Sequence, residues 1–246
     1  MALVNSFERS GNWLFRYRGQ IPVILFVAAI PVVYYTNISW LSETSRQLLT
    51  IASILLSFLG FIIRAISIGT TPIGTSGRNT KEGQVAESLN TKGIYSMVRH
   101  PLYLGNYFMW IGIVLFTFNF SFVIIVSLMF WLYYERIMFA EERFLERKFG
   151  EIYMNWARKT PAFIPCFKKY ERNELPLSYK SILKREYSGV LATVVGFVFI
   201  DDLRKYFEVG HIEFDTIAHW ALAVTIVIVL VLRSLKQYTQ FFREEG

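Results

Sequence analysis

Cysteine and charge are both scarce in this sequence of 246 residues. Its one cysteine, Cys166, excludes an internal disulfide and leaves a zinc cluster without its usual ligands. Charged residues make up only 18% of the chain and hydrophobic residues 53%, with a mean hydropathy of +0.35. These proportions exclude a disordered chain and a coiled coil, and they indicate an integral membrane protein. The chain also lacks a Gly-x-Gly-x-x-Gly loop, a Walker sequence and a serine-hydrolase elbow, which argues against Rossmann-type enzymes, ATPases and hydrolases.

Positive charge is in excess, with 26 Lys and Arg against 19 Asp and Glu and a net charge of +7. No basic stripe with interleaved stacking aromatics lies on a polar segment, so nucleic acid is not the expected partner. In a membrane protein the excess is first an orientation signal and an attraction to anionic lipid head groups.

Apolar segments predict an all-α, polytopic transmembrane bundle of about six spans in one domain, residues 1–246. The segments lie at about 21–38, 47–68, 102–118, 120–138, 187–200 and 217–233. Several are shorter than the roughly 20 residues of a straight span, so we expect tilt or extension into their flanks. Only Phe118 to Ser121 separate the third and fourth segments. That link is so short that it predicts a tight hairpin of antiparallel helices.

The distribution of Lys and Arg predicts that both termini are cytoplasmic. With that topology the outside loops near 39–46 and 201–216 hold three of the 26 basic residues, which are Arg46, Arg204 and Lys205. The loop 69–101, the amphipathic stretch 135–165 and the basic linker 166–186 then lie together on the cytoplasmic side. We expect the chemistry of the protein to be there.

The string from Gly93 to Asn106 places Arg99, His100 and Tyr103 at the mouth of the third predicted span. Pro101 suits the first position of a helix, and the free N–H groups there favour a carboxylate or phosphate. A purely structural interpretation is equally open at this point, with a snorkelling arginine, a helix-starting proline and an interfacial tyrosine.

A second group of ionisable residues, Arg136, Glu141 and Glu142, follows the fourth predicted span. Charges at helical spacing commonly form only weak surface pairs. Here the hairpin returns the chain beside its entry point, so these three residues should lie near His100. Ionisable groups that converge at the edge of a membrane indicate a functional site.

Together the two strings resemble a known family. Gly-x-Tyr-x-x-x-Arg-His-Pro-x-Tyr-x-Gly at 93–105 and Glu-Glu-x-x-Leu-x-x-x-Phe-Gly-x-x-Tyr at 141–153, with Pro161 and Pro165 after them, are similar to the isoprenylcysteine carboxyl methyltransferase and phospholipid methyltransferase superfamily. Its members are integral membrane enzymes that use S-adenosylmethionine. The match covers about 93–165, and the predicted pair of helices in 187–233 is appended to this core with no assigned role.

The resemblance implies roles for individual residues. It places Arg136 and Glu141 beside the reacting centre as catalytic residues, and Glu142 at the polar end of the cofactor. The rest of the implied cofactor pocket consists of Tyr95, His100, Pro101, Tyr103, Leu104 and Gly105. Methyl transfer needs no metal. It needs alignment, desolvation and a placed acceptor, and only an amine acceptor would need a base such as Glu141.

The loop at 69–81 precedes the core and is rich in glycine, hydroxyl and amide groups. It is either a flexible connector or a phosphate-binding loop for a lipid head group. The candidate head-group ligands are Thr75, Ser76, Arg78, Asn79 and Arg99. This stretch also resembles bacterial members of the superfamily that methylate a lipid A phosphate.

The sequence therefore predicts a methyltransferase that takes S-adenosylmethionine from the cytoplasm and a membrane lipid from the bilayer, with an anionic head group such as a lipid phosphate as the first choice of acceptor. Alternatives are an isoprenylcysteine-type carboxyl or a phospholipid amine acceptor, and, from another class, a lipid-binding or transport protein without chemistry. The expected location is a prokaryotic inner membrane, and a homo-oligomer is left open.

Overall fold

A computed structural model of the chain describes residues 2–72, 75, 78–80, 83–212, 214 and 216–242. Helices dominate it, which confirms the predicted all-α class. The elements are α1 (Leu3–Tyr17), α2 (Ile21–Tyr35), α3 (Glu43–Gly69), β1 (Arg78–Thr80), β2 (Gly83–Val85), α4 (Ile94–Met97), α5 (Pro101–Leu115), α6 (Phe120–Phe149), α7 (Glu151–Lys159), the 3-10 turn η1 (Phe167–Lys169), α8 (Tyr179–Val209) and α9 (Ile217–Tyr238). The two short strands form an antiparallel hairpin that the sequence did not predict.

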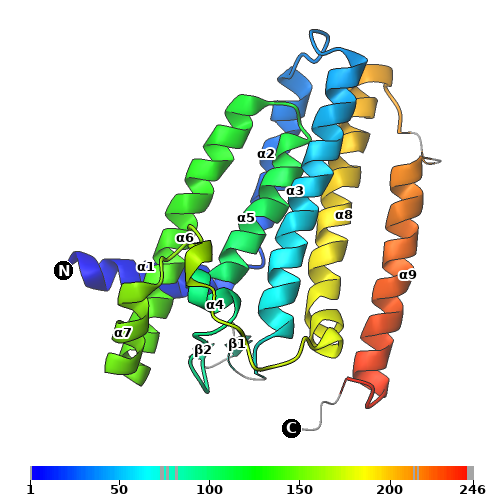
Figure 1. Cartoon of the computed structure of the whole chain (residues 1–246). Helices are drawn as coiled ribbons and strands as arrows, with labels where there is room; N and C mark the ends of the chain where they lie inside the picture. The colour runs from blue at the N-terminus through cyan, green and yellow to red at the C-terminus, as the bar shows by residue number, and fades with distance from the viewer. Residues whose placement is uncertain are drawn as a thin grey trace.

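Each of the six apolar segments is helical, as expected. In the described residues, α3, α6 and α9 are long and apolar enough to cross a membrane by themselves. Helices α1 and α2 meet at 80° and count as a fourth span only if they are taken together, and α5 is a shorter apolar helix. In α8 the uncharged stretch 187–200 is flanked by charged residues, which explains why it falls outside this group. The protein is an integral membrane protein built as a helical bundle (Figure 1).

Close packing of α3 against α5 forms the centre of the bundle. A side chain on Gly60 would lie 2.5 Å from the carbonyl oxygen of Gly105, and one on Gly112 would lie 2.2 Å from Ser57 Oγ. Ser57 also donates a hydrogen bond to the carbonyl of Met109 at 3.0 Å. Small residues let the two backbones approach, which is how helices associate tightly where water supplies no driving force.

The predicted hairpin between the third and fourth segments is confirmed. Helix α5 ends at Leu115 and α6 begins at Phe120. Phe118 turns the chain with a φ of 59°, and the Asn119 side chain accepts a hydrogen bond from the Phe122 amide at 2.8 Å, which caps α6.

One end of the bundle gathers the segments that carry the motifs. Figure 1 shows α4, α7 and the strands at the lower end of the long helices, with α1 lying across the same region. Helix α6 continues unbroken from the bundle into this end, as the amphipathic stretch after residue 135 predicted. The segments brought together are the ones expected to share a side.

Candidate active site

A polar cavity of about 470 Å³ lies at this end of the bundle. Its lining comes from most of the chain: the link between α1 and α2, α3, the segment after β2, α4, α5, α6, α7 and the first turns of α8. The cavity therefore closes only when segments from both halves of the sequence are in place.

Backbone hydrogen bonds fix the position of the Arg-His-Pro string. The amides of Arg99 and His100 donate to the carbonyls of Pro161 and Ala162 at 2.9 and 3.2 Å. The extended chain after α7 is thus paired with the residues that precede Pro101, the first residue of α5. This pairing explains why Pro161 accompanies the motif, because a proline supplies an acceptor while needing no partner for an N–H.

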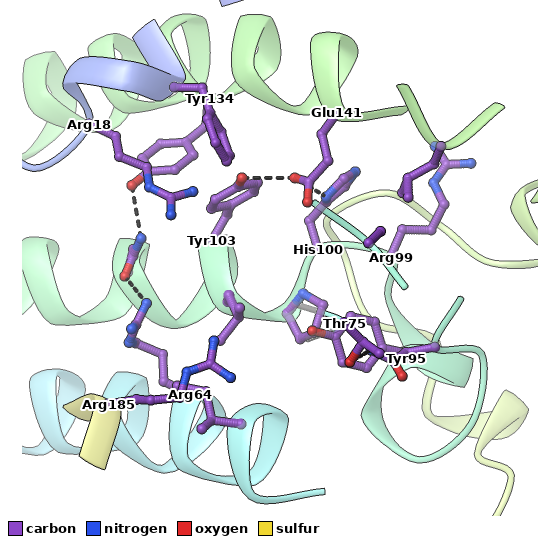
Figure 2. A pocket seen from close by; sticks show the side chains of 18 of the residues that line it. Arg18, Arg64, Thr75, Tyr95, Arg99, His100, Tyr103, Tyr134, Glu141 and Arg185 are labelled. Carbon is purple, nitrogen blue, oxygen red and sulfur yellow. Dashed lines mark hydrogen bonds and ion pairs between the residues drawn. The ribbon is translucent and has the colours of Figure 1, made fainter. Parts of the chain in front are cut away.

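Two adjacent carboxylates on α6 meet the string from α5. The Tyr103 hydroxyl donates to Glu141 Oε2 at 2.8 Å, and His100 Nε2 pairs with Glu142 Oε1 at 2.8 Å. His100 Nδ1 lies 3.7 Å from Glu141 Oε2, and Arg99 Nε lies 3.0 Å from Glu142 Oε1. Figure 2 shows Glu141 reaching toward His100 and Tyr103. The hairpin therefore does bring the two strings together, and it places a buried histidine between two carboxylates.

The Phe-Gly-x-x-Tyr part of the second string turns the chain back to the cavity. Gly150 has a φ of +53°, which ends α6 and lets α7 start in a new direction. As a result Tyr153 is buried in the cavity wall, and Trp156 donates to the carbonyl of Tyr95 at 3.2 Å. Burial, and then the charge of Glu142, raises the pKa of Tyr153; burial, and then Glu141, raises the pKa of Tyr95. Both phenols stay neutral and can act as hydrogen-bond donors.

Most of the residues predicted to hold the cofactor lie in or beside the cavity. Those that line it are Tyr95, His100, Pro101 and Tyr103, together with the predicted catalytic Glu141. Glu142 contacts the lining through His100 and Arg99. Leu104 and Gly105 are buried but are not brought to the lining. A side chain on Gly105 would lie 2.5 Å from Arg64 Cγ, so this glycine serves the contact between α5 and α3.

Arg136, predicted to be catalytic, is not brought to the cavity. Its guanidinium lies over the ring of Phe7 in α1, 3.7 Å from the centroid, and it approaches Ser10 Oγ at 3.5 Å. Gly11 of α1 packs against the backbone of α6 at this same residue. Helical geometry gives the reason. Glu141 is five positions after Arg136, and this offset places the two residues roughly 140° apart around the helix.

Only two of the five predicted head-group ligands are placed in the lining of the cavity by the described residues. Thr75 and Arg99 line the cavity, and Thr75 accepts a hydrogen bond from the Asn90 side chain at 3.0 Å. Arg78 and Asn79 are described only as backbone of β1, and Ser76 lies outside the described residues. The phosphate-binding role of this loop stays a prediction.

Sequence reasoning missed a buried ion pair between α3 and α8. Arg64 donates to both carboxylate oxygens of Glu186, at 2.8 Å from Nε and 2.6 Å from Nη2, and its Nη1 donates to Asn106 Oδ1 at 2.5 Å. Asn106 in turn donates to the Tyr134 hydroxyl at 2.9 Å. The signal available in the sequence was the pair of polar residues, Arg64 and Asn106, inside otherwise apolar segments.

Two further arginines, Arg18 and Arg185, also line the cavity and were not assigned to it from the sequence. Arg18 follows α1 directly, and Arg185 lies in the second turn of α8. The sequence places Arg185 in the basic linker 166–186. In the structure, residues 179–186 are instead the start of α8, and Arg185 lines the cavity.

A second, apolar cavity of about 280 Å³ continues from the polar one into the bundle. Its walls come mainly from α2, α5 and α8, and the two cavities share the residues Gly19, Pro22, Arg64, Asn106 and Trp110. In the part of the chain that the structure describes, no group of three or more His, Cys, Asp or Glu side chains is placed to hold a metal ion.

Comparisons with known proteins find relatives of the core of this chain. Residues 48–152 match the family described as phospholipid methyltransferase. The nickel-cobalt-cadmium resistance protein of Alcaligenes xylosoxydans xylosoxydans is 31% identical over 136 residues, which cover 55% of this chain and 61% of that protein. The cobalt-zinc-cadmium resistance protein of Cupriavidus metallidurans is 30% identical over 129 residues, 52% of this chain and 57% of that protein.

An enzyme of known chemistry is among the relatives. The protein-S-isoprenylcysteine O-methyltransferase of Schizosaccharomyces pombe is 28% identical over 128 residues, which cover 46% of this chain and 54% of the enzyme. The chain thus spans a little over half the length of these curated relatives, and no solved structure gives a significant match. The matched core holds the first string and all but the last residue of the second, and it is similar to phospholipid and isoprenylcysteine methyltransferases, as the two strings predicted.

Proposed function

We propose that this protein is an S-adenosylmethionine-dependent methyltransferase that acts on a membrane amphiphile. The observation that carries the proposal is the pair of joined cavities, one polar and one apolar, with shared walls at Arg64, Asn106 and Trp110. A polar cofactor and an amphiphile with an apolar tail need such a pair of compartments. A transport protein would instead need a polar path through the bundle, whereas the second cavity has an apolar lining.

The polar cavity fits the cofactor in size and chemistry. About 470 Å³ falls within the range of roughly 300–1,000 Å³ that small-molecule sites occupy. Glu141 and Glu142 match the positive amino and sulfonium groups of S-adenosylmethionine, and Arg99 matches its carboxylate. Tyr95 and Trp156 offer aromatic faces for the adenine.

S-adenosylmethionine, when bound, supplies an electrophilic methyl carbon attached to a positively charged sulfur. The residues of the chain then have three tasks: to align the acceptor, to exclude water and to hold charge. Tyr103 and His100 fix the Glu141 carboxylate, so it is placed rather than free to rotate. An anionic acceptor needs no base, whereas an amine acceptor would pass its proton to Glu141.

The acceptor that we favour is an anionic head group such as a lipid phosphate, as in lipid A. The carboxyl of an isoprenylcysteine is the alternative with direct support from a relative, and a phospholipid amine is the third candidate. We place the polar cavity on the cytoplasmic side of a prokaryotic inner membrane, where the cofactor is available, with both termini on that side.

Incubation of the purified protein in detergent with methyl-labelled S-adenosylmethionine and total lipid of its host tests the proposal. Mass spectrometry should find a lipid that gains one methyl group, and calorimetry should find cofactor binding. Glu142→Gln should weaken cofactor binding by about tenfold, because it removes the charge that is hydrogen-bonded to His100 and ion-paired with Arg99. Glu151→Gln, on the exposed first turn of α7, is the matched control. If the protein bound no S-adenosylmethionine, the proposal would be wrong.

A further inference from the structure

The charges around the polar cavity are separated into two regions. His100, Glu141 and Arg99 lie in one region, toward α7. Arg18, Arg64 and Arg185 lie in the other, and Figure 2 shows these three arginines on the left of the opening with His100 and Glu141 on the right. The first region is the one assigned above to the cofactor. The second region has no role in the cofactor site assigned above.

Among the described residues that line the cavity, the arginine region holds three arginines and one carboxylate. Of the described residues that line the cavity, Glu186 is the only carboxylate in this region. It is 2% exposed and is occupied by the bidentate ion pair with Arg64. Arg18, which follows α1, and Arg185 of α8 place two more guanidinium groups in the same lining. Guanidinium groups that line a cavity favour an oxyanion, since they offer several donors in a fixed plane.

The arginine region is also where the polar cavity meets the apolar one. Arg64 and Asn106 line both cavities, and their hydrogen bond of 2.5 Å lies at the boundary. An amphiphile whose tail enters the apolar cavity would therefore present its first polar group to this region. Glu186 holds the Arg64 guanidinium from the other side, so that one Nη atom remains directed at Asn106.

From these observations, and resting on the function proposed above, we propose that Arg18, Arg64 and Arg185 bind the acceptor itself as an ionised oxyanion, either a carboxylate or a phosphate, and that Glu186 is a positioning residue for Arg64. A lone pair of the oxyanion forms the new oxygen–carbon bond while the carbon–sulfur bond of S-adenosylmethionine breaks and sulfur keeps the electron pair. One negative and one positive charge cancel, and no proton moves. Helix α8, outside the matched region 48–152, thereby selects the class of substrate.

Three amphiphiles with the same tail test the acceptor class: palmitate, hexadecyl phosphate and hexadecylamine, each supplied in lipid nanodiscs with the full-length protein and labelled S-adenosylmethionine. Palmitate or hexadecyl phosphate should gain a methyl group or compete with methyl transfer to host lipid, and hexadecylamine should do neither. Faster methylation of palmitate would identify the acceptor as a carboxylate, and faster methylation of hexadecyl phosphate would identify it as a phosphate. Activity on hexadecylamine alone, or no effect of any of the three on a working enzyme, would overturn the inference.

Substitution of Arg185 separates acceptor binding from cofactor binding. Arg185→Gln should raise the KM for the acceptor by about tenfold to a hundredfold, the loss expected for one charge-assisted hydrogen bond, with an unchanged Kd for S-adenosylmethionine. Arg185→Lys should recover part of the loss. Lys180→Gln is the matched control, because it removes the same charge from an exposed position of the same helix. Equal KM values for Arg185→Gln and Lys180→Gln would contradict the proposal.

The role of Glu186 requires a variant that still folds. Glu186→Gln leaves the partly buried Arg64 without its counter-charge, and this change alone can unfold the protein. The double substitution of Arg64→Leu with Glu186→Leu removes both charges, so it should restore thermal stability while the KM for the acceptor stays raised. A double variant with normal KM would exclude Arg64 from acceptor binding. If the wild-type protein bound no S-adenosylmethionine, the proposed function would fail first, and the two failures are thus distinguishable.

Discussion

Helices α8 and α9 both follow the matched core, yet they differ in what they contribute. Helix α8 buries Glu186, Gly196, Val198 and Ile200, packs against α2, α3 and α5, and lines both cavities. Helix α9 packs against α8 and, over Ile217–Tyr238, has no buried residue. One helix of the pair is therefore a wall of the site and the other presents its apolar surface outward, as a helix in contact with lipid would. Position in the sequence, after the core, does not show which helix has which role.

Truncation should reveal the largest difference between the two helices. A chain that ends at Ser178 loses Glu186, Arg185 and the α8 wall of the apolar cavity, so methyl transfer should fall by about 100-fold or more, since a misplacement of about 1 Å already costs that much. A chain that ends at Gly210 keeps α8 and should retain activity. Activity of both chains in the lipid-labelling assay is the measurement. Equal activity of the two would remove the distinction between α8 and α9.

A smaller effect is expected from single substitutions that enlarge a residue on each helix. A Cβ on Gly196 of α8 would lie 2.8 Å from Ile113 Cδ1 of α5, so Gly196→Leu overpacks this contact and should cost about 1–3 kcal/mol of stability. Ala223 of α9 is exposed, and Ala223→Leu should change stability by less than about 0.5 kcal/mol. Unfolding curves in one detergent compare the two variants. A loss of stability in the α9 variant would show that this face is packed in the working protein.

The smallest effect is expected at Arg136, a charged residue of the matched core whose side chain contacts α1 and does not line the cavity. Arg136→Ala removes the cation–π contact with Phe7 and should cost about 0.5–2 kcal/mol of stability, with kcat and KM close to wild type. Thermal unfolding and steady-state methyl transfer provide the two readouts. A large fall in kcat at unchanged stability would instead return Arg136 to the reacting centre that the family resemblance assigned to it.

The parts of the structure that could be predicted from the sequence are those fixed by neighbouring residues. Runs of apolar residues predicted the six helices, and the short link at Phe118 predicted the hairpin that brings Glu141 to His100. Contacts between distant segments were beyond prediction. Arg64 and Glu186 are 122 residues apart, and one sequence does not indicate which polar residue of one helix will meet which residue of another.

Two differences between the sequence-based picture and the structure have causes within single helices. The family resemblance placed Arg136 beside Glu141 at the reacting centre, whereas the period of the helix turns the two residues to different faces, and the catalytic role of Arg136 stays a prediction. Helix α1 was missed because its mixed polar and apolar residues do not form a continuous apolar run, yet they suit a helix that lies across the bundle with one side packed on α6.

The ion pair of Arg64 with Glu186 has a consequence for biosynthesis. Helix α3 enters the membrane carrying an arginine whose counter-charge is still more than a hundred residues from being synthesised. During that interval the long side chain must reach the interface or water, because a lone charge in hydrocarbon is expensive. Arrival of α8 removes that penalty and closes both cavities in the same step. Assembly of the site thus waits for α8, and a nascent chain stalled before α8 holds no finished pocket in which cofactor or lipid could be trapped.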